Sequence, residues 1–535
     1  MSRSILLVVL VAVLGCAPGD SSMEAPDGEP SLAVVLVIDQ LTPELLERYD
    51  AVWTGGFRRL LDGGHQFSDA VQDHAITFTS PGHASPTTGV VPARHGIVGN
   101  SWREWRDGMW ESVSSVADPD TELVGGSGSG SSPRNLLVDG LPDWLLEQRP
   151  GSRVVSLSGK STAGVLMGGR AAPTSPTGDP DARHVYWFSA SNEGFVTSTH
   201  YREALPDWVQ AFNRTIVERV TTEDCWEPVI PEEFIDLSRR DRAEYEADGV
   251  HIAFPHCIDD EPYRGAAHFV TRTPALDLAT LEFATEAIAA LDLGQRESPD
   301  YLSLALSATD RVGHEWGPFS REQFDNLVRL DRELGRWFER LDQTVGPDRY
   351  VVALTSDHGV LPLPEYLEEQ GLYGLRLTSE LGEAYSEASE GLDPSGPEHT
   401  GEDGAAARAE LAERLERVEW VEAAMPFELL ASDTPADSFV VLYRKSFHPD
   451  RLSTRMANHG VETRLVEGTL VRATGTTHGV PYLHDRSVPL LFYGAGLEAG
   501  VSTDPVRTVD LAPTLGRMLG VSVPEGLDGR DLLSR

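Results

Sequence analysis

Three short apolar runs in this chain each end in residues of a type that binds metal ions. AVVLVID ends on Asp39, YLSLALSATD on Asp310, and VVALTSDH on Asp357 and His358. Aliphatic runs without polar alternation predict parallel strands that are buried on both faces. In open α/β sheets, functional sites form beyond the carboxyl ends of such strands. The pattern therefore predicts an α/β fold with a metal site at one edge of its sheet.

Other parts of the chain extend this prediction. RVVSLS at 153–158 and VPLLFYG at 488–494 read as further core strands. Apolar residues at helical spacing over 43–61 predict a helix directly after the first strand, and those over 324–341 predict a helix packed on the sheet. The alternation of strands and helices is that of a large α/β enzyme.

The length of 535 residues exceeds what one ordinary core needs. We expect one catalytic domain over 31–535, interrupted by insertions at about 185–275 and about 362–470. Low-complexity stretches at 125–133 and 171–182 are expected to be surface loops with no packing capacity.

The N-terminus predicts export. Arg3 precedes the apolar stretch ILLVVLVAVL, which is followed by Gly15, Cys16 and small polar residues. Such a segment is too short to span a bilayer, which needs about 20 apolar residues. It resembles bacterial lipoprotein signals, which implies a signal peptide over 1–15, lipidation of Cys16 and a tether over 16–30. The expected location is the periplasm or cell surface, with the protein anchored to a membrane through its lipid.

The net charge limits the class of binding partner, and the cysteine content predicts a disulfide. A net charge of −40 argues against docking to nucleic acid, because like charges repel. It does not exclude an anionic substrate, since bound divalent cations reverse the local field. Besides Cys16 the chain has only Cys225 and Cys257, which we expect to form a disulfide in an oxidising compartment, with two unpaired thiols as the alternative.

Thr79, in the segment TFTSPGHAS at 77–85, is the candidate nucleophile. Pro81 suits the first turn of a helix. The Thr79 hydroxyl would then face unpaired N–H groups and the positive end of the helix dipole, which favour an alkoxide and a bound phosphate. A threonine before proline is also a common helix cap, and this segment alone does not decide between the two roles.

Five segments resemble the alkaline phosphatase superfamily: VVLVIDQ, TFTSPGHASPTTGVVPARHGIVGNSW, SATDRVGHEWGP, TSDHG and TGTTHGVPYLHDRSVPLLFYG. The resemblance is to its threonine-nucleophile branch, which includes the type I phosphodiesterase/nucleotide pyrophosphatase family and the PafA-like bacterial alkaline phosphatases. It runs from about residue 33 to about 530. It implies an alkaline-phosphatase-like three-layer α/β/α sandwich with a mostly parallel sheet and cap insertions.

The resemblance also implies two Zn²⁺ ions. One would be held by Asp39, Thr79, Asp357 and His358, and the other by Asp310, His314 and His478. Mixed carboxylate and imidazole ligands favour zinc over magnesium, which prefers oxygen and water. Without the resemblance, Asp310 and His314 also read as an ordinary i, i+4 pair on a helix surface.

Three further positions are carried over from the family. Asn100 matches the asparagine that hydrogen-bonds a phosphoryl oxygen, and Lys160 matches a lysine near the phosphate, although a lone lysine is usually solvated. Thr162 stands where the PafA-like pattern has arginine. An arginine binds two oxygens of a dianionic monoester, whereas a threonine hydroxyl offers one neutral hydrogen bond. Arg170 is a candidate replacement from another position.

These residues predict hydrolysis of a phosphate ester through a covalent phosphothreonine at Thr79. The closeness of the motifs and Lys160 favour a phosphomonoesterase of the alkaline phosphatase type. The missing arginine favours a phosphodiesterase or nucleotide pyrophosphatase, and a phosphotransferase is a third hypothesis. A cluster of Trp102, Trp105 and Trp110 would either stack an aromatic leaving group or pack in the interior. The sequence predicts no oligomeric state.

Overall fold

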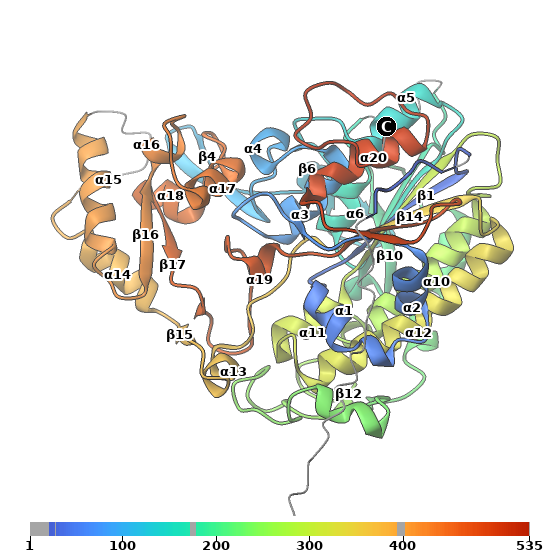
Figure 1. Ribbon diagram of the computed structural model, residues 1–535, viewed down its shortest axis with the longest axis horizontal. Coiled ribbons are helices and arrows are strands. Elements are labelled where there is room, and N and C mark those ends of the chain that lie inside the picture. Colours follow the sequence, from blue (N-terminus) through green and yellow to red (C-terminus); the bar gives the residue numbers. More distant parts are fainter. Residues whose placement is uncertain (1–20, 27, 172–177, 393–401, 534–535) are drawn as a thin grey trace, which may run out of the picture.

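A single large sheet organises the protein, for which a computed structural model describes residues 21–26, 28–171, 178–392 and 402–533. The sheet has eleven strands, which Figure 1 shows near the centre and right of the molecule. Their order is β20 (Gly500–Ser502), β2 (His65–Phe67), β19 (Leu490–Gly494), β14 (Tyr350–Thr355), β1 (Leu32–Ile38), β13 (Asp300–Leu306), β8 (Val154–Ser158), β9 (Arg183–Ser189), β10 (Gly194–Ser198), β6 (Ala117–Val124) and β7 (Ser129–Ser131).

The centre of this sheet is parallel and its margins are mixed. Strands β14, β1, β13, β8 and β9 pair in parallel with one another, in that order. Strand β19, predicted from VPLLFYG, joins β14 in the antiparallel direction, and β10 returns antiparallel to β9. The site described below depends on the parallel centre, because there the carboxyl ends of neighbouring strands meet at one edge.

Helices cover both faces of the sheet. Leu32, Val34, Leu36 and Ile38 of β1 pack in one hydrophobic core, and the residues between them pack in a second. The first core includes α1 (Pro43–Arg48), α2 (Gly56–Gly63), α10 (Ala275–Ala290) and α12 (Arg321–Thr344). The second includes α5 (Leu141–Gln148), α6 (Ser161–Met167) and α20 (Leu511–Met518). Strand β1 therefore lies between two helical layers, and the predicted three-layer α/β/α fold is confirmed.

One predicted helix is divided in two. The segment 43–61 forms α1, a short 3₁₀ helix (Asp50–Val52) and α2. The Asp331 carboxylate accepts the backbone N–H groups of Thr54 at 2.9 Å and Gly55 at 2.8 Å. A Cβ at Gly55 would lie 2.2 Å from the Asp331 carbonyl oxygen. A residue larger than glycine at position 55 would therefore prevent this segment from packing against Asp331. This long-range contact holds the non-helical turn that divides the predicted helix.

Two sequence-based boundaries are corrected. The first insertion was expected from about 185, but β9 and β10 belong to the main sheet, so the excursion starts only after Ser198. The stretch 125–133 was expected to be a loop without packing, yet β7 within it pairs with β6 at the sheet margin. Its serine and glycine residues add backbone hydrogen bonds, which need no apolar side chains.

The second insertion forms a cap beside the core. Its elements are α13 (Pro364–Glu369), β15 (Leu375–Leu377), α14 (Glu380–Ala388), α15 (Glu402–Leu415), β16 (Val421–Pro426), α16 (Phe427–Leu430), α17 (Ser438–Ser446), α18 (Thr454–His459), β17 (Val461–Leu465) and β18 (Thr469–Val471). Figure 1 shows most of them in orange at the left, with α17 and α18 close to β4 (Ser101–Arg106) and α4 (Pro92–His95) of the core. Paired backbone hydrogen bonds between Arg103 and Leu452 join core and cap.

The first insertion contains the predicted disulfide. Cys225 and Cys257 are bonded, and they face each other across the short strands β11 (Cys225–Trp226) and β12 (His256–Cys257). The prediction of a bridge is confirmed. Residues 1–20 lie outside the described part of the chain, so the signal peptide, the lipidation of Cys16 and the membrane anchor stay predictions. Among the described residues, no helix has the length and apolar character that crossing a membrane requires.

Candidate active site

Three neighbouring parallel strands deliver ligand-type side chains to one edge of the sheet. Asp39 follows β1 directly, and Asp357 and His358 follow β14. Strand β13 leads into α11 (Ala308–Trp316), whose first turn carries Asp310 and whose last turn carries His314. The four-residue spacing on a helix places these two side chains on the same face. Strand order and helix geometry together bring the side chains to one place.

These residues form two groups that could each hold a metal ion. One is Asp39, Asp357 and His358, and the other is Asp310, His314 and His478. Within each group the ligand atoms lie within 4.8 Å of one another. His478 comes from the segment that returns from the cap, before α19 (Leu483–Arg486). The structure thus brings together all six carboxylate and imidazole ligands that the sequence indicated.

The three imidazoles are oriented by backbone carbonyl groups. Each ring places Nδ1 within hydrogen-bonding distance of a carbonyl oxygen: His314 of Thr476 at 2.8 Å, His358 of Gly359 at 2.9 Å, and His478 of Thr77 at 2.7 Å. Because a carbonyl only accepts, Nδ1 of His358 and of His478 donates, and in the neutral ring Nε2 is left with its lone pair. His314 Nδ1 also lies 3.1 Å from the Arg472 guanidinium, which can only donate, so its carbonyl contact does not fix the tautomer of that ring. Such second contacts are typical of metal-binding histidines.

Several buried polar atoms in the first group have no hydrogen-bond partner among the described residues. They are Asp39 Oδ1, Asp357 Oδ2 and His358 Nε2. His358 Nε2 lies 3.2 Å from Asp357 Oδ2 and 3.5 Å from Asp39 Oδ1, and all three side chains are fully buried. Unpaired buried polar atoms are costly, whereas coordination to a cation would satisfy all of them at once. The donor set therefore fits a metal ion.

The electrostatics of the site point the same way. Burial, together with the carboxylates of Asp310 and Asp357, raises the pKa of Asp39 to about 7. Burial opposes the charge on His358, but Asp357 and Asp39 outweigh it and raise its pKa to about 9. Negative charge is thus crowded into a buried volume, where bound cations are the usual compensation.

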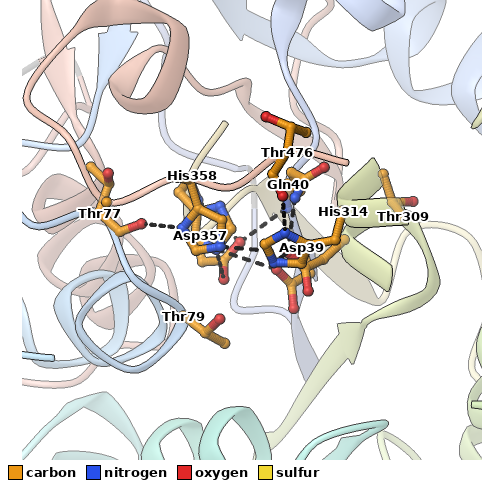
Figure 2. A network of polar contacts seen from close by, with 12 residues as sticks. Asp39, Gln40, Thr77, Thr79, Thr309, His314, Asp357, His358 and Thr476 are labelled. Carbon is orange, nitrogen blue, oxygen red and sulfur yellow. Dashed lines mark hydrogen bonds and ion pairs between the residues drawn. The ribbon is translucent and has the colours of Figure 1, made fainter. Parts of the chain in front are cut away.

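Thr79 begins α3 (Thr79–Thr88), as its place before Pro81 predicts. Figure 2 shows its side chain close to Asp357 and His358 but joined to neither by a polar contact, and 5 % of the residue is exposed. Helix α3 lies very close to Asp357: a Cβ at Gly82 would be only 2.3 Å from the Asp357 carbonyl oxygen. Glycine at this position lets the start of α3 lie against the first ligand group.

Asn100 is held beside the candidate nucleophile Thr79 by a hydrogen bond from the next residue. The Ser80 N–H donates to Asn100 Oδ1 at 2.8 Å, and the Asn100 side chain is otherwise exposed. With its oxygen occupied, the amide group of Asn100 presents its two N–H donors to an approaching group. The arrangement suits an acceptor such as a phosphoryl oxygen next to Thr79.

Lys160 reaches the centre of the site from α6. Its ammonium group lies 2.5 Å from Asp39 Oδ2 and 2.5 Å from Asp310 Oδ2, so it contacts one carboxylate of each ligand group. Thr162 lies half-buried in the first turn of the same helix, and its hydroxyl has no hydrogen bond within the described residues. Arg170 does not replace the missing arginine, because its guanidinium is bound to Asp139 and to the Leu136 carbonyl.

Three residues that support the site were not identified from the sequence. Gln40 donates its backbone N–H to Asp357 Oδ1 at 3.1 Å and its side-chain amide to Asp310 Oδ1 at 2.9 Å, and it adopts a left-handed backbone with φ of 69°. His83 Nδ1 lies 2.8 Å from the Thr79 carbonyl. Asp485 accepts from the Thr77 hydroxyl and from the loop after His478. All three lie in the motif segments quoted above, which was the one available signal.

The sequence pattern of the type I phosphodiesterase/nucleotide pyrophosphatase family matches residues 33–456. The chain belongs to this family. Its predicted relationship to the threonine-nucleophile branch of the alkaline phosphatase superfamily is therefore confirmed. As a member of this family, the protein is a phosphoric ester hydrolase.

Curated relatives and solved structures agree with this assignment. The alkaline phosphatase PafA of Elizabethkingia meningoseptica is 30% identical over 558 residues, which cover 98% of each chain. The alkaline phosphatase PhoV of Synechococcus elongatus is 30% identical over 560 residues, with the same coverage. A crystal structure of wild-type alkaline phosphatase PafA superposes with a TM-score of 0.84 at 28% identity, covering 94% of this chain and 98% of that one.

Proposed function

We propose that the protein is a phosphomonoesterase of the alkaline phosphatase type, which uses two zinc ions and a covalent phosphothreonine at Thr79. The position of Lys160 carries this proposal. Its ammonium contacts one carboxylate of each ligand group, so it brings a positive charge to the place where the two groups meet. Burial opposes that charge, but Asp310 and Asp39 outweigh it and raise the Lys160 pKa, so the lysine stays cationic.

The reaction follows from the residues around Thr79. The Thr79 oxygen attacks phosphorus, the ester bond breaks, and the alcohol leaves with a proton as the phosphothreonine forms. Water then attacks phosphorus, phosphate is released and the Thr79 hydroxyl is restored. Asn100 donates from its free amide N–H groups to a non-bridging oxygen, and Lys160 stabilises the negative charge there. Zinc held by the two ligand groups would supply Lewis acidity and lower the pKa of the attacking hydroxyl.

A second cation supports the preference for dianionic monoesters. Arg311 follows Asp310 on α11, is exposed, and has no ion pair among the described residues. It lies close enough to Lys160 for its charge to lower the Lys160 pKa. Two cations at the site favour a dianion over the singly charged diester. The alternative, a phosphodiesterase, rests on Thr162, which cannot bind two phosphoryl oxygens as an arginine does.

The direct test compares kcat/KM for an aryl phosphate monoester and the matching diester. We expect the monoester to be preferred by about three decades, or roughly 4 kcal/mol of transition-state stabilisation at 1.36 kcal/mol per decade. Thr162→Arg should widen this preference, because a guanidinium adds bidentate contacts to the dianion. A preference of the wild-type enzyme for the diester would reject the monoesterase assignment and support the phosphodiesterase.

Gln40→Leu is expected to weaken metal binding at the group of Asp310, His314 and His478. The Gln40 backbone would still contact Asp357, but the side-chain bond that orients Asp310 would be lost. Loss of such a supporting contact typically costs about 10- to 100-fold in metal affinity. Zinc affinity is measured by competition with a chromophoric chelator. Gln66→Leu is the matched control, because the Gln66 side chain donates to the Leu61 carbonyl, away from the site. Equal affinities in the two variants would contradict a positioning role for Gln40.

A further inference from the structure

A cavity of about 470 Å³ lies between the catalytic core and the cap. Core residues Phe78, Val98 and Trp102 line one side. The cap supplies the other side through residues of α16, α17, α18, β17 and β18 and their connections: Leu430, Tyr443, Phe447, Leu452, Thr454, Met456, Leu465 and Leu470. The volume is within the range of small-molecule sites, which is about 300–1,000 Å³.

The cavity begins at the active site itself. Its lining includes Phe78, which precedes the nucleophile, and Gly99 and Ser101, which flank Asn100. It also includes the ligand-type His478, whose ring packs edge-on against Phe78 at 5.8 Å between centroids. A group esterified to a phosphoryl held between Thr79 and Asn100 would therefore have this cavity beside it.

The lining favours an uncharged, flat group, because aromatic rings stand in it beside serine and threonine residues and its charged side chains are paired. Four aromatic residues contribute to it: Phe78, Trp102, Tyr443 and Phe447. Its charged side chains already have partners. Arg455 is bound to Glu462 at 3.0 Å. Arg451 lies 3.7 Å from the Glu104 carboxylate and stacks on Trp102. No unpaired charge in the lining would compensate a second anionic group.

We propose that this cavity is the leaving-group site, and that it binds an uncharged aromatic ring attached through the ester oxygen. The inference rests on the proposed function, because it assumes that the phosphoryl group is bound at Thr79. Aromatic rings gain from both area burial and ring contacts in such a pocket. The cap, which contributes most of the lining, would thus determine substrate preference.

The structure also separates the three tryptophans that the sequence grouped together. Trp102 is 2 % exposed, lines the cavity and is held by a hydrogen bond from its Nε1 to Glu104. Trp105 is 45 % exposed and packs against Trp110, and neither of these two lines the cavity. Of the three, Trp102 alone is placed to contact a leaving group.

Calorimetric binding of two non-hydrolysable dianions tests the proposal. We expect zinc-loaded protein to bind phenylphosphonate on the order of 10- to 100-fold more tightly than methylphosphonate, as burial of a ring predicts. Phe447→Ala removes one wall, and Thr454→Trp fills the cavity from an exposed position at the start of α18. Both should bring the ratio of the two affinities towards one while leaving methylphosphonate affinity unchanged.

Trp105→Ala is the matched control and should keep the wild-type ratio, since Trp105 lies outside the cavity. A wild-type ratio near one, or a wild-type ratio retained in Thr454→Trp, would overturn the inference. Calorimetry measures binding without turnover, so it tests the aromatic site, whereas the hydrolysis assay tests the proposed function. Selective phenylphosphonate binding by a protein without Thr79-dependent hydrolysis would retain the aromatic site and reject the phosphatase.

Discussion

Thr79→Ala is expected to abolish turnover of phosphate esters, with kcat falling on the order of 10⁴-fold or more. The reason is that no other hydroxyl takes its place at the start of α3: the neighbouring Ser80 is fully buried and its hydroxyl lies 2.8 Å from that of Ser115. Removing the nucleophile of a hydrolase that works through a covalent intermediate costs up to about 10⁶ in kcat. The measurement is kcat for an aryl phosphate monoester.

Two further variants make this result specific. Thr79→Ser keeps a hydroxyl and should retain measurable turnover and form a phosphoserine that mass spectrometry detects after an acid quench. Thr88→Ala removes a threonine hydroxyl from the other end of the same helix, where it bonds to the Ala84 carbonyl, and should leave kcat close to wild type. Zinc content should be nearly unchanged in Thr79→Ala, because the carboxylate and imidazole ligands remain. A wild-type kcat in Thr79→Ala would show that Thr79 is not the nucleophile.

Removal of metal is expected to have an effect of similar size. Dialysis against a strong chelator should reduce hydrolysis to background and lower Tm, since an ion bound only by the folded state stabilises that state. Lowering of Tm is expected because the buried carboxylates of Asp39, Asp310 and Asp357 would lose their compensating charge. Zn²⁺ should restore both activity and Tm, whereas Mg²⁺ should not, since imidazole ligands favour zinc.

Two histidine variants test whether the metal is bound at the proposed ligands. His478→Ala removes a ligand of the second group and should bring zinc content from two ions per chain towards one, as measured by plasma mass spectrometry. His459→Ala removes a half-exposed histidine of the cap that belongs to neither group and should leave zinc content unchanged. Undiminished hydrolysis by protein shown to be free of metal would contradict the zinc proposal.

Much of the site was predictable because its ligands are local to predictable elements. Asp39 directly follows a buried strand, and Asp357 and His358 follow another after one intervening residue. Strands of this kind can be recognised from runs of β-branched and aliphatic residues. Asp310 and His314 lie in the first and the last turn of α11, the helix that follows β13. The chain order of such elements places their ends together once the sheet is parallel. The family motifs then indicated Asn100, Lys160 and Thr162 at positions that the structure places on the same edge.

Other features could not be predicted because they depend on contacts between distant segments. The division of the helix at 43–61 results from Asp331, which is far away in the sequence. The left-handed conformation of Gln40 and its two bonds exist only when β14 and α11 are already in place. The exclusion of Arg170 from the site likewise depends on Asp139 and on the Leu136 carbonyl. None of these contacts leaves a periodic signal in the sequence.

The sequence by itself determined the fold class and the family, and it indicated the disulfide partners, the six metal-type ligands and the candidate nucleophile, because apolar periodicity and short motifs are properties of contiguous residues. Only the tertiary structure decided which strands of the sheet run antiparallel, which residues orient the ligands, and that Trp102 but not Trp105 faces a cavity beside the site. The cavity has walls from residues 76–102, from Leu361 and from residues 430–480, so its shape depends on how the cap packs on the core. Packing between such distant segments is set by the whole folded chain, and no local pattern encodes it.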